Sequence, residues 1–301
     1  MQAVYADTLR WRASSASSDA LDANPWRAPS TATVMRVACE SRLSLSDMAL
    51  VAARMVLDDS PRMNRAPDQI IVCTTSFEHD LALSCACRLH CELGSSQAPF
   101  AIGQLQDVSF VMALEVALAM MNADTGLQAT LIVAAERWLP PFARRTGTLT
   151  VMGDGAAAVL LSRDPVPGWL VRDVAIRTPA TAPLPAGMNL QPAGAATLQE
   201  IIDQTCLRAG VRAADIDWIM PASIDARIAD QISSRCGVSE QRHWPTCEAS
   251  PGHLCAADMP ARLDALWKSV RPAAGQRTLI WSSGFQGQAG CALFEFSGDS
   301  A

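Results

Sequence analysis

Short apolar runs alternate with longer amphipathic stretches along most of the chain. The runs have the length and β-branched content of buried strands, and we expect strands at residues 69–74, 98–102, 131–135, 156–162, 169–176, 218–221, 278–282 and 289–296. Between them, apolar residues recur at helical spacing in residues 46–57, 81–93, 108–121, 198–209, 224–236 and 256–270. Strands that alternate with helices predict mainly parallel, helix-covered sheets.

Capping residues and hydropathy refine three of these helices. Ser46 or Asp47 is expected to cap the first helix, and Gly94 is expected to end the second. The helix over residues 108–121 has little polar punctuation, which predicts burial on most of its sides. Residues 1–30 are polar and rich in alanine and serine, and we expect a short first strand followed by a loop.

The two halves of the chain repeat one pattern. Three segments of the first half are answered in order in the second: Asp68–Ser76 by Asp215–Ser223, Leu131–Ala135 by Leu279–Ser283, and Gly153–Leu161 by Gly287–Phe294. A repeat of this length predicts a duplicated domain rather than a solenoid. The Pro- and Gly-containing stretch 165–168 marks the boundary, so the predicted halves are residues 1–164 and 165–301. In duplicated α/β proteins the chemistry is expected where the halves meet.

Composition removes several classes of function. Half of the 301 residues are apolar, the net charge is −6 and aromatic residues are few, so no basic or stacking surface for nucleic acid is expected. The ten cysteines lie mostly inside apolar elements, which favours reduced thiols and a cytoplasmic protein. Residues 1–12 do not form a signal peptide, and no run is long enough for a membrane span.

Several motifs occur in a fixed order within residues 46–296. They are Cys73-Thr74-Thr75-Ser76 before a cysteine-containing helix, Gly153-Asp154-Gly155-Ala156, Ala209-Gly210 with Asp215-Ile216-Asp217-Trp218 and Pro221, Gly252–Pro260, and Gly284-Phe285-Gln286-Gly287. Together they resemble the thiolase superfamily and, within it, the 3-ketoacyl-[acyl carrier protein] synthase III group. The resemblance implies an α/β, five-layer αβαβα fold of two duplicated halves, and a dimer.

The resembled enzymes use a Cys-His-Asn triad, and each position is carried over separately. The nucleophile position, two residues before Ser109-Phe110, falls on Asp107, or on Gln106 if the register shifts by one. The His position falls on Ala222 and the Asn position on His253. Without the thiolate, the standard condensation mechanism is not expected.

Two polar residues therefore remain as catalytic candidates. Asp107 is predicted to act as a general base, alone or by orienting His253, because a carboxylate beside an imidazole is a familiar base arrangement. The alternative is that Asp107 only caps the helix that follows and that His253 is structural. Cys255 and Cys247 flank the site and are weaker candidates for a substitute nucleophile.

A basic loop is the candidate donor-binding segment. The resemblance places Arg137, Trp138, Arg144 and Arg145 where related enzymes contact pantetheine or a carrier protein, and positive charge suits an acidic carrier. A solvated loop is the alternative. The densest group of Cys and His residues lacks the spacing of a zinc site, and we expect packing cysteines there: His79, Cys85, Cys87, His90 and Cys91.

These expectations define two hypotheses. The first is a synthase-III-like acyltransferase of a specialised-metabolite or fatty-acyl pathway. It would pass an acyl group from an acyl carrier protein thioester or acyl-CoA to a small-molecule amine, hydroxyl or carbon nucleophile without a Cys acyl-enzyme. The second is a non-catalytic partner subunit of a Cys-containing paralogue. We expect no cofactor, metal, nucleic acid or membrane partner, and a homodimer or a heterodimer with that paralogue.

Overall fold

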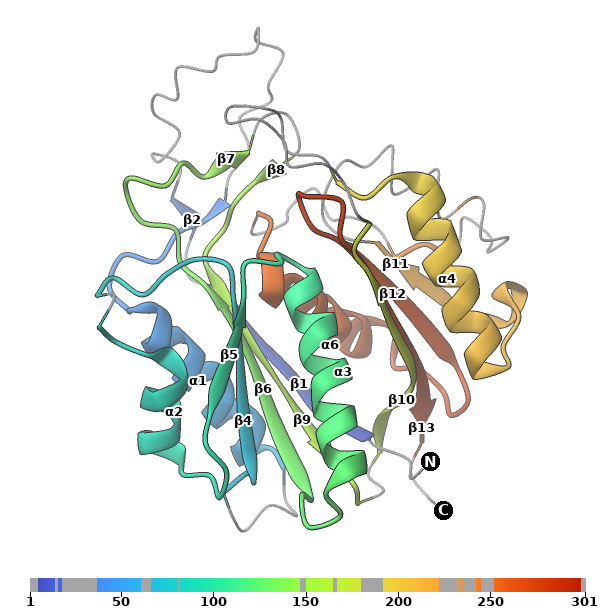
Figure 1. Cartoon of the computed structure of the whole chain (residues 1–301), viewed down its shortest axis with the longest axis horizontal. Coiled ribbons are helices and arrows are strands. Elements are labelled where there is room, and N and C mark those ends of the chain that lie inside the picture. Colours follow the sequence, from blue (N-terminus) through green and yellow to red (C-terminus); the bar gives the residue numbers. More distant parts are fainter. Residues whose placement is uncertain are drawn as a thin grey trace, which may run out of the picture.

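A computed structural model describes most of the chain (Figure 1). The described residues are 5–13, 16–17, 37–60, 66–80, 82–146, 150–164, 167–179, 192–221, 232, 234, 242–244 and 252–298. Their main sheet has nine strands in the order β11-β12-β13-β10-β1-β9-β6-β4-β5. Two small pairs lie outside it: β2 (Ala16–Ser17) with β3 (Val37–Ala38), and β7 (Arg145–Thr146) with β8 (Thr150–Val151).

The main sheet consists of two halves with the same pairing pattern. The first contains β1 (Tyr5–Ala13), β4 (Gln69–Thr74), β5 (Phe100–Gly103), β6 (Ala129–Glu136) and β9 (Gly155–Ser162). The second contains β10 (Gly168–Arg177), β11 (Trp218–Met220), β12 (Arg277–Ser283) and β13 (Ala289–Ser297). In the first, β4 runs parallel to β6, and β6 and β1 both run antiparallel to β9. In the second, β11 runs parallel to β12, and β12 and β10 both run antiparallel to β13.

The helices lie in three layers around these halves, as Figure 1 shows. They are α1 (Leu45–Asp58), α2 (Cys85–Leu93), α3 (Val108–Ala123), α4 (Ala195–Ala209) and α6 (Asp258–Val270). Helices α1 and α2 cover the outside of the first half, and α4 covers the outside of the second. Helix α3 contacts strands of both halves, and α6 packs on β1 and β9 while its Trp267 contacts Phe296 of β13. The five αβαβα layers and the duplication predicted from the sequence are confirmed. The predicted mainly parallel pairing is wrong: β4–β5, β4–β6 and β11–β12 are parallel, and the other five neighbouring pairs of the main sheet are antiparallel.

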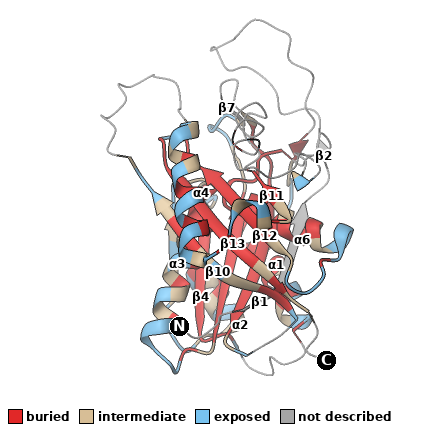
Figure 2. Ribbon diagram, turned by 90° about the vertical axis from the view of Figure 1, so that its right-hand side faces the viewer, coloured by how far each residue is buried: buried red, intermediate tan, exposed pale blue. Residues whose placement is uncertain are grey.

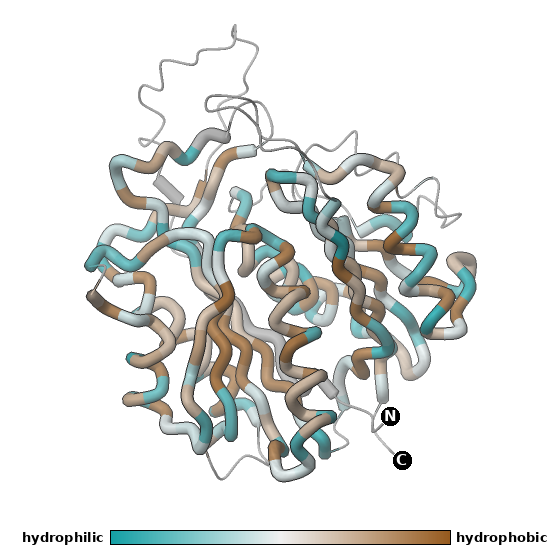
Figure 3. Tube along the Cα trace, viewed as in Figure 1, coloured by the Kyte–Doolittle hydropathy of each residue, from teal (hydrophilic) through white to brown (hydrophobic). Residues whose placement is uncertain are grey.

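Strands β4, β6 and β9 of the first half bury both faces, whereas the edge strand β5 is only partly buried. In β9, Ala157, Val159 and Leu161 belong to the core shared with α3 and the second half, whereas Ala156, Ala158 and Leu160 face the α1 and α2 core. Strands covered on both sides read as continuous apolar runs because neither face can carry polar side chains. Figure 2 shows most of the central strands buried, and Figure 3 shows the matching band of hydrophobic residues through the sheet.

Several predicted boundaries change in the structure. Ser44, not Ser46 or Asp47, caps α1: its hydroxyl accepts from Asp47 N, and the Asp47 carboxylate accepts in return from Ser44 N. Helix α2 begins at Cys85, later than predicted, because Ser84 caps it. Most of the predicted helix 224–236 lies outside the described residues, and so does residue 165 at the predicted boundary between the halves. The division into residues 1–164 and 165–301 therefore stays a prediction. None of the helices in the described part is long and apolar enough to cross a membrane.

Candidate active site

Asp107 lies at the start of the central helix α3, inside the protein. The turn before it passes through Gln104 and Gln106, whose φ angles of 65° and 51° are unusual for residues with a side chain. The Gln106 side chain fixes this turn against the second half, because its Oε1 accepts from Phe285 N at 3.0 Å. Asp107 itself has helical backbone angles, and its carboxylate makes no capping hydrogen bond. The interpretation of Asp107 as a simple N-cap therefore has no hydrogen bond to support it.

His253 reaches the same place from the second half. Its backbone is bonded to the strand region before β9: His253 N donates to Val151 O at 2.8 Å, and its carbonyl accepts from Gly153 N at 3.0 Å. Gly252, with φ +92°, precedes it, and a Cβ there would approach Val151 O to 2.9 Å. Only glycine allows this close approach, which directs the imidazole towards the start of α3.

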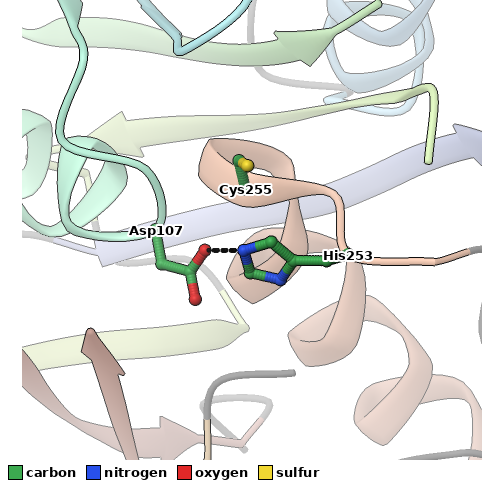
Figure 4. A group of neighbouring side chains, drawn as sticks. All are labelled: Asp107, His253 and Cys255. Carbon is green, nitrogen blue, oxygen red and sulfur yellow. Dashed lines mark ion pairs between the residues drawn. The ribbon is translucent and has the colours of Figure 1, made fainter. Parts of the chain in front are cut away.

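Asp107 and His253 form a fully buried pair. His253 Nε2 lies 2.9 Å from Asp107 Oδ1, and neither side chain is exposed (Figure 4). Within the described part of the chain, the other two polar atoms of the pair, Asp107 Oδ2 and His253 Nδ1, have no hydrogen-bond partner. Buried polar atoms are nearly always paired, because leaving one unpaired costs about 1–3 kcal/mol. This buried pair is therefore the candidate catalytic site.

Burial and mutual attraction shift both pKa values of the pair. Burial is the largest single influence on His253 and opposes its charged form. The charge of Asp107 and the hydrogen bond to it, with the charges of Asp258 and Glu136, together outweigh burial and raise the His253 pKa to about 9. Burial raises the pKa of Asp107, and His253 acts in the opposite direction. The two groups titrate as a unit, so a proton on the pair belongs to both.

Cys255 is the third side chain at this point. It begins the short helix η3 (Cys255–Ala257), is fully buried, and has a φ of 43°. Its Sγ lies 3.7 Å from Met152 Sδ. Burial raises the pKa of its thiol well above the ordinary value, and the nearby carboxylates of Glu136 and Asp107 raise it further. As an isolated thiol, Cys255 would be a poor nucleophile because the thiolate is the reactive form.

Sequence reasoning missed Glu136, a buried carboxylate at the end of β6. Its Oε1 accepts from Thr75 N at 2.8 Å and Ala256 N at 3.3 Å, and its Oε2 accepts from Ser76 N at 2.8 Å. It therefore ties the end of β4 to the helix that carries Cys255. A single acidic residue that ends an apolar strand was the only available signal.

Glu136 predicts a measurable pH dependence of stability. Burial raises its pKa from 4.5 to about 7, against the opposing hydrogen bonds from Ser76 and Thr75. A carboxyl group with a raised folded-state pKa stabilises the fold fully at low pH and loses that stabilisation as pH rises through 7. We expect about 3 kcal/mol of unfolding free energy to be lost from this group between about pH 4.5 and 7.

The test is denaturant unfolding of wild type and Glu136→Gln at several pH values. The glutamine amide nitrogen cannot accept a hydrogen bond from the backbone N–H group that faces it. The unfolding free energy of the variant is therefore lower than that of wild type by about 1–3 kcal/mol at low pH. The difference between the two proteins should shrink as pH rises towards 7. A difference that is independent of pH would contradict the raised pKa.

Asp154 organises the loop that carries the predicted donor-binding residues. Its carboxylate accepts two bonds of 2.7 Å from the Arg144 guanidinium and one from the backbone N–H of each of Trp138 and Glu40. Arg144 also donates to the carbonyls of Trp138 and Met152. Arg144 thus closes the loop on itself, and its guanidinium is largely occupied.

The other three predicted donor-binding residues differ in burial and in how much of their side chains is described. Arg137 and Trp138 are half-buried, and the Arg137 Nε and Trp138 Nε1 atoms are buried without a hydrogen-bond partner in the described structure. Arg145 lies in β7, where only its backbone is described. The donor-binding role of all four residues stays a prediction.

The structure brings Asp107 and His253 together, as the sequence predicted, and adds Cys255 and Glu136 to their surroundings. Ala222 and Cys247 lie outside the described residues. Gln106 supports the turn before Asp107 and bonds to Phe285, so the position beside the imidazole belongs to Asp107. The fold and this site together define a thiolase-like protein with a buried carboxylate and imidazole between its halves.

Comparison with known proteins identifies the family. Residues 106–179 match the description 3-oxoacyl-[acyl-carrier-protein] synthase III, and residues 206–296 match its C-terminal part. A curated relative, beta-ketoacyl-[acyl-carrier-protein] synthase III of Bordetella petrii, is 27% identical over 86% of this chain and 84% of its own. The two matched segments cover more than half of the chain, which therefore belongs to the 3-oxoacyl-[acyl-carrier-protein] synthase III family.

Solved structures agree in fold. ChlB3, described as an acyltransferase, matches with a TM-score of 0.82 at 18% identity over 98% of both chains. The synthase III FabH of Pseudomonas aeruginosa PAO1 matches with a TM-score of 0.78 at 19% identity, also over 98% of both chains. At these identities the likeness establishes the thiolase-like fold.

Proposed function

We propose that the protein is an acyltransferase that moves an acyl group from a carrier-protein thioester to an amine, hydroxyl or carbon nucleophile without a Cys acyl-enzyme. The observation that carries the proposal is the buried Asp107–His253 pair, in which Asp107 Oδ1 and His253 Nε2 are in contact and Asp107 Oδ2 and His253 Nδ1 have no other partner in the described structure. The residue at the position of the family's nucleophile is a carboxylate rather than a thiol, which supports direct transfer.

The pair can supply the proton transfer that direct acyl transfer needs. Asp107 and His253 together accept the proton of the acceptor X–H group as X attacks the thioester carbonyl. The C–X bond forms, the C–S bond breaks, and the proton passes to the departing pantetheine thiolate. Positioned acid–base groups of this kind typically contribute about 10²- to 10⁴-fold in rate.

The loop after β6 is proposed to receive the donor. The Arg137 Nε and Trp138 Nε1 groups, which have no hydrogen-bond partner in the described structure, can donate to a pantetheine amide or a phosphate, and Arg145 is proposed to add positive charge to the same loop. Arg144 is proposed to contribute by holding the loop through Asp154. These roles follow the prediction made from the sequence, and the ChlB3 match is consistent with an acyltransferase.

The proposal is tested with acyl-carrier-protein thioesters and a panel of amine, hydroxyl and carbon acceptors. We expect acylated product and, by intact-protein mass spectrometry, no acyl adduct on the protein at any time during turnover. A covalent adduct that forms and decays at the rate of turnover, mapped to Cys255 or any other residue, would overturn the direct mechanism.

A second function is favoured by one surface. Strand β5 is at the edge of the described sheet, and beside it α3 keeps Met112, Val116 and Met120 only half-buried at a spacing of four residues. An apolar helix stripe next to a strand edge suits a second subunit. A non-catalytic subunit paired with a Cys-containing paralogue would use this surface and need no chemistry at Asp107.

Gel filtration after co-expression with a Cys-containing paralogue distinguishes the two functions. If the protein is the proposed acyltransferase, it turns over alone, as a homodimer. A stable heterodimer in which only the paralogue's Cys is acylated, with no turnover by this protein alone, supports the partner function instead.

A further inference from the structure

Three potential metal ligands converge at the proposed site. One ligand atom from each of Asp107, His253 and Cys255 lies within 4.8 Å of the other two, and all three residues are buried. They come from the start of α3 and from the segment that leads into η3, so the two halves of the fold together form the cluster. Figure 4 shows the Asp107 carboxylate and the His253 imidazole facing each other. In this view Cys255 lies above the imidazole.

We propose that this cluster binds a divalent transition-metal ion of the Zn²⁺ class. Carboxylate oxygen, imidazole nitrogen and thiolate sulfur are the ligand types that Zn²⁺ accepts, and three protein ligands with one open position are typical of its catalytic sites. The inference concerns metal binding alone and does not depend on the acyl transfer proposed above.

The charges of the cluster suit a divalent cation. A deprotonated Cys255 and an ionised Asp107 carry two negative charges, which a 2+ ion neutralises, while His253 binds as the neutral imidazole. Buried charges are tolerated when they are paired or coordinate a metal.

The distances are close to those of a coordinated site. Two ligands about 2.0 Å from a tetrahedral zinc ion lie about 3.3 Å apart, and Asp107 Oδ1 and His253 Nε2 are 2.9 Å apart. The Cys255 sulfur lies within 4.8 Å of both atoms and has to move closer to complete the coordination. Cys255 is also held in the left-handed region, at φ 43°, and such backbone strain is concentrated at functional sites.

Metal binding would change the proposed chemistry. A metal on Nε2 and Oδ1 takes the lone pairs with which the pair would accept a proton. If the proposed acyl transfer is correct, Zn²⁺ loading therefore lowers its rate and a chelator restores it; this consequence rests on the proposed function, whereas the binding itself does not.

The experiment is titration of chelator-treated, reduced protein with Co²⁺ and Zn²⁺. We expect one Zn²⁺ per chain by elemental analysis after dialysis, and a near-ultraviolet thiolate-to-cobalt absorption band that Zn²⁺ displaces. Cys255→Ser removes the band, and His253→Asn weakens binding by a factor of ten or more. Cys87→Ser is the matched control, since Cys87 is exposed on α2 and its loss leaves the band unchanged.

Two results would overturn the inference. One is the absence of stoichiometric metal in wild-type protein whose circular dichroism shows it to be folded. The other is a band of full strength in Cys255→Ser or its loss in Cys87→Ser. His253→Asn keeps the inference testable if Cys255→Ser does not fold, because asparagine is the residue that the resembled family carries at this position. Acyl-transfer assays on the same samples report separately on the proposed function.

Discussion

Removing either member of the Asp107–His253 pair is expected to lower acyl transfer by about 10²- to 10⁴-fold, the contribution of a positioned acid–base group. Asp107→Asn keeps the shape of the side chain but cannot accept the acceptor's proton. His253→Ala removes the imidazole, whose Nε2 lies 2.9 Å from the carboxylate. Because the two groups act as a unit, the double variant should be about as slow as the slower single variant.

The measurement is kcat and kcat/KM for product formation, with folding followed by thermal unfolding. Glu115→Gln is the matched control for Asp107→Asn, because Glu115 is an exposed carboxylate on the same helix. His79→Ala is the control for His253, since the His79 side chain is half-exposed. His253→Ala leaves a buried carboxylate without its cationic neighbour, and Asp107→Asn/His253→Asn removes that penalty. Unchanged turnover in this folded double variant would eliminate the catalytic role of the pair.

The second large effect is expected from Asp154→Asn. Asp154 is fully buried and receives both terminal nitrogens of Arg144, whose side chain is only 10% exposed. The substitution leaves a largely buried guanidinium without its counter-charge and removes an acceptor from the loop after β6. Breaking one partner of a buried pair costs about 3–5 kcal/mol in unfolding free energy.

Urea unfolding of wild type and variant measures this loss. The control is Glu92→Gln, which breaks the ion pair of Glu92 with Arg54 at the surface, where both side chains are about half exposed. That pair should contribute about 0–1 kcal/mol. If Asp154→Asn lowers the unfolding free energy no more than Glu92→Gln does, Asp154 does not hold the loop in the way its hydrogen bonds imply.

Much of the fold could be predicted from the sequence, because the apolar runs of the first half recur in the second. The apolar runs that became β6 and β9 recur as β12 and β13, and both pairs are antiparallel in the structure. Strands buried on both faces leave an unmistakable run of apolar residues. Helix starts were less accurate, since Ser44 and Ser46 are both capable caps and only the backbone geometry chooses Ser44.

The candidate site was only half predictable. Asp107 and His253 could be found because motifs around them fix their positions, although they are far apart in the chain. Glu136 could not be found in this way, because an acidic residue at the end of a strand is usually exposed to solvent. Only the structure shows that the backbone N–H groups of Thr75, Ser76 and Ala256 donate to it. The sequence does not distinguish Arg144 from Arg145, but in the structure Arg144 forms an ion pair with Asp154.

The sequence by itself determined the class of fold, the duplication and the absence of a thiol at position 107, since these depend on residue identity and periodicity along the chain. Only the tertiary structure decided that Asp107, His253 and Cys255 meet in one buried place. The physical reason is that burial and distance arise from packing one half against the other. Those quantities set the pKa values and ligand geometry on which any chemistry at the site depends.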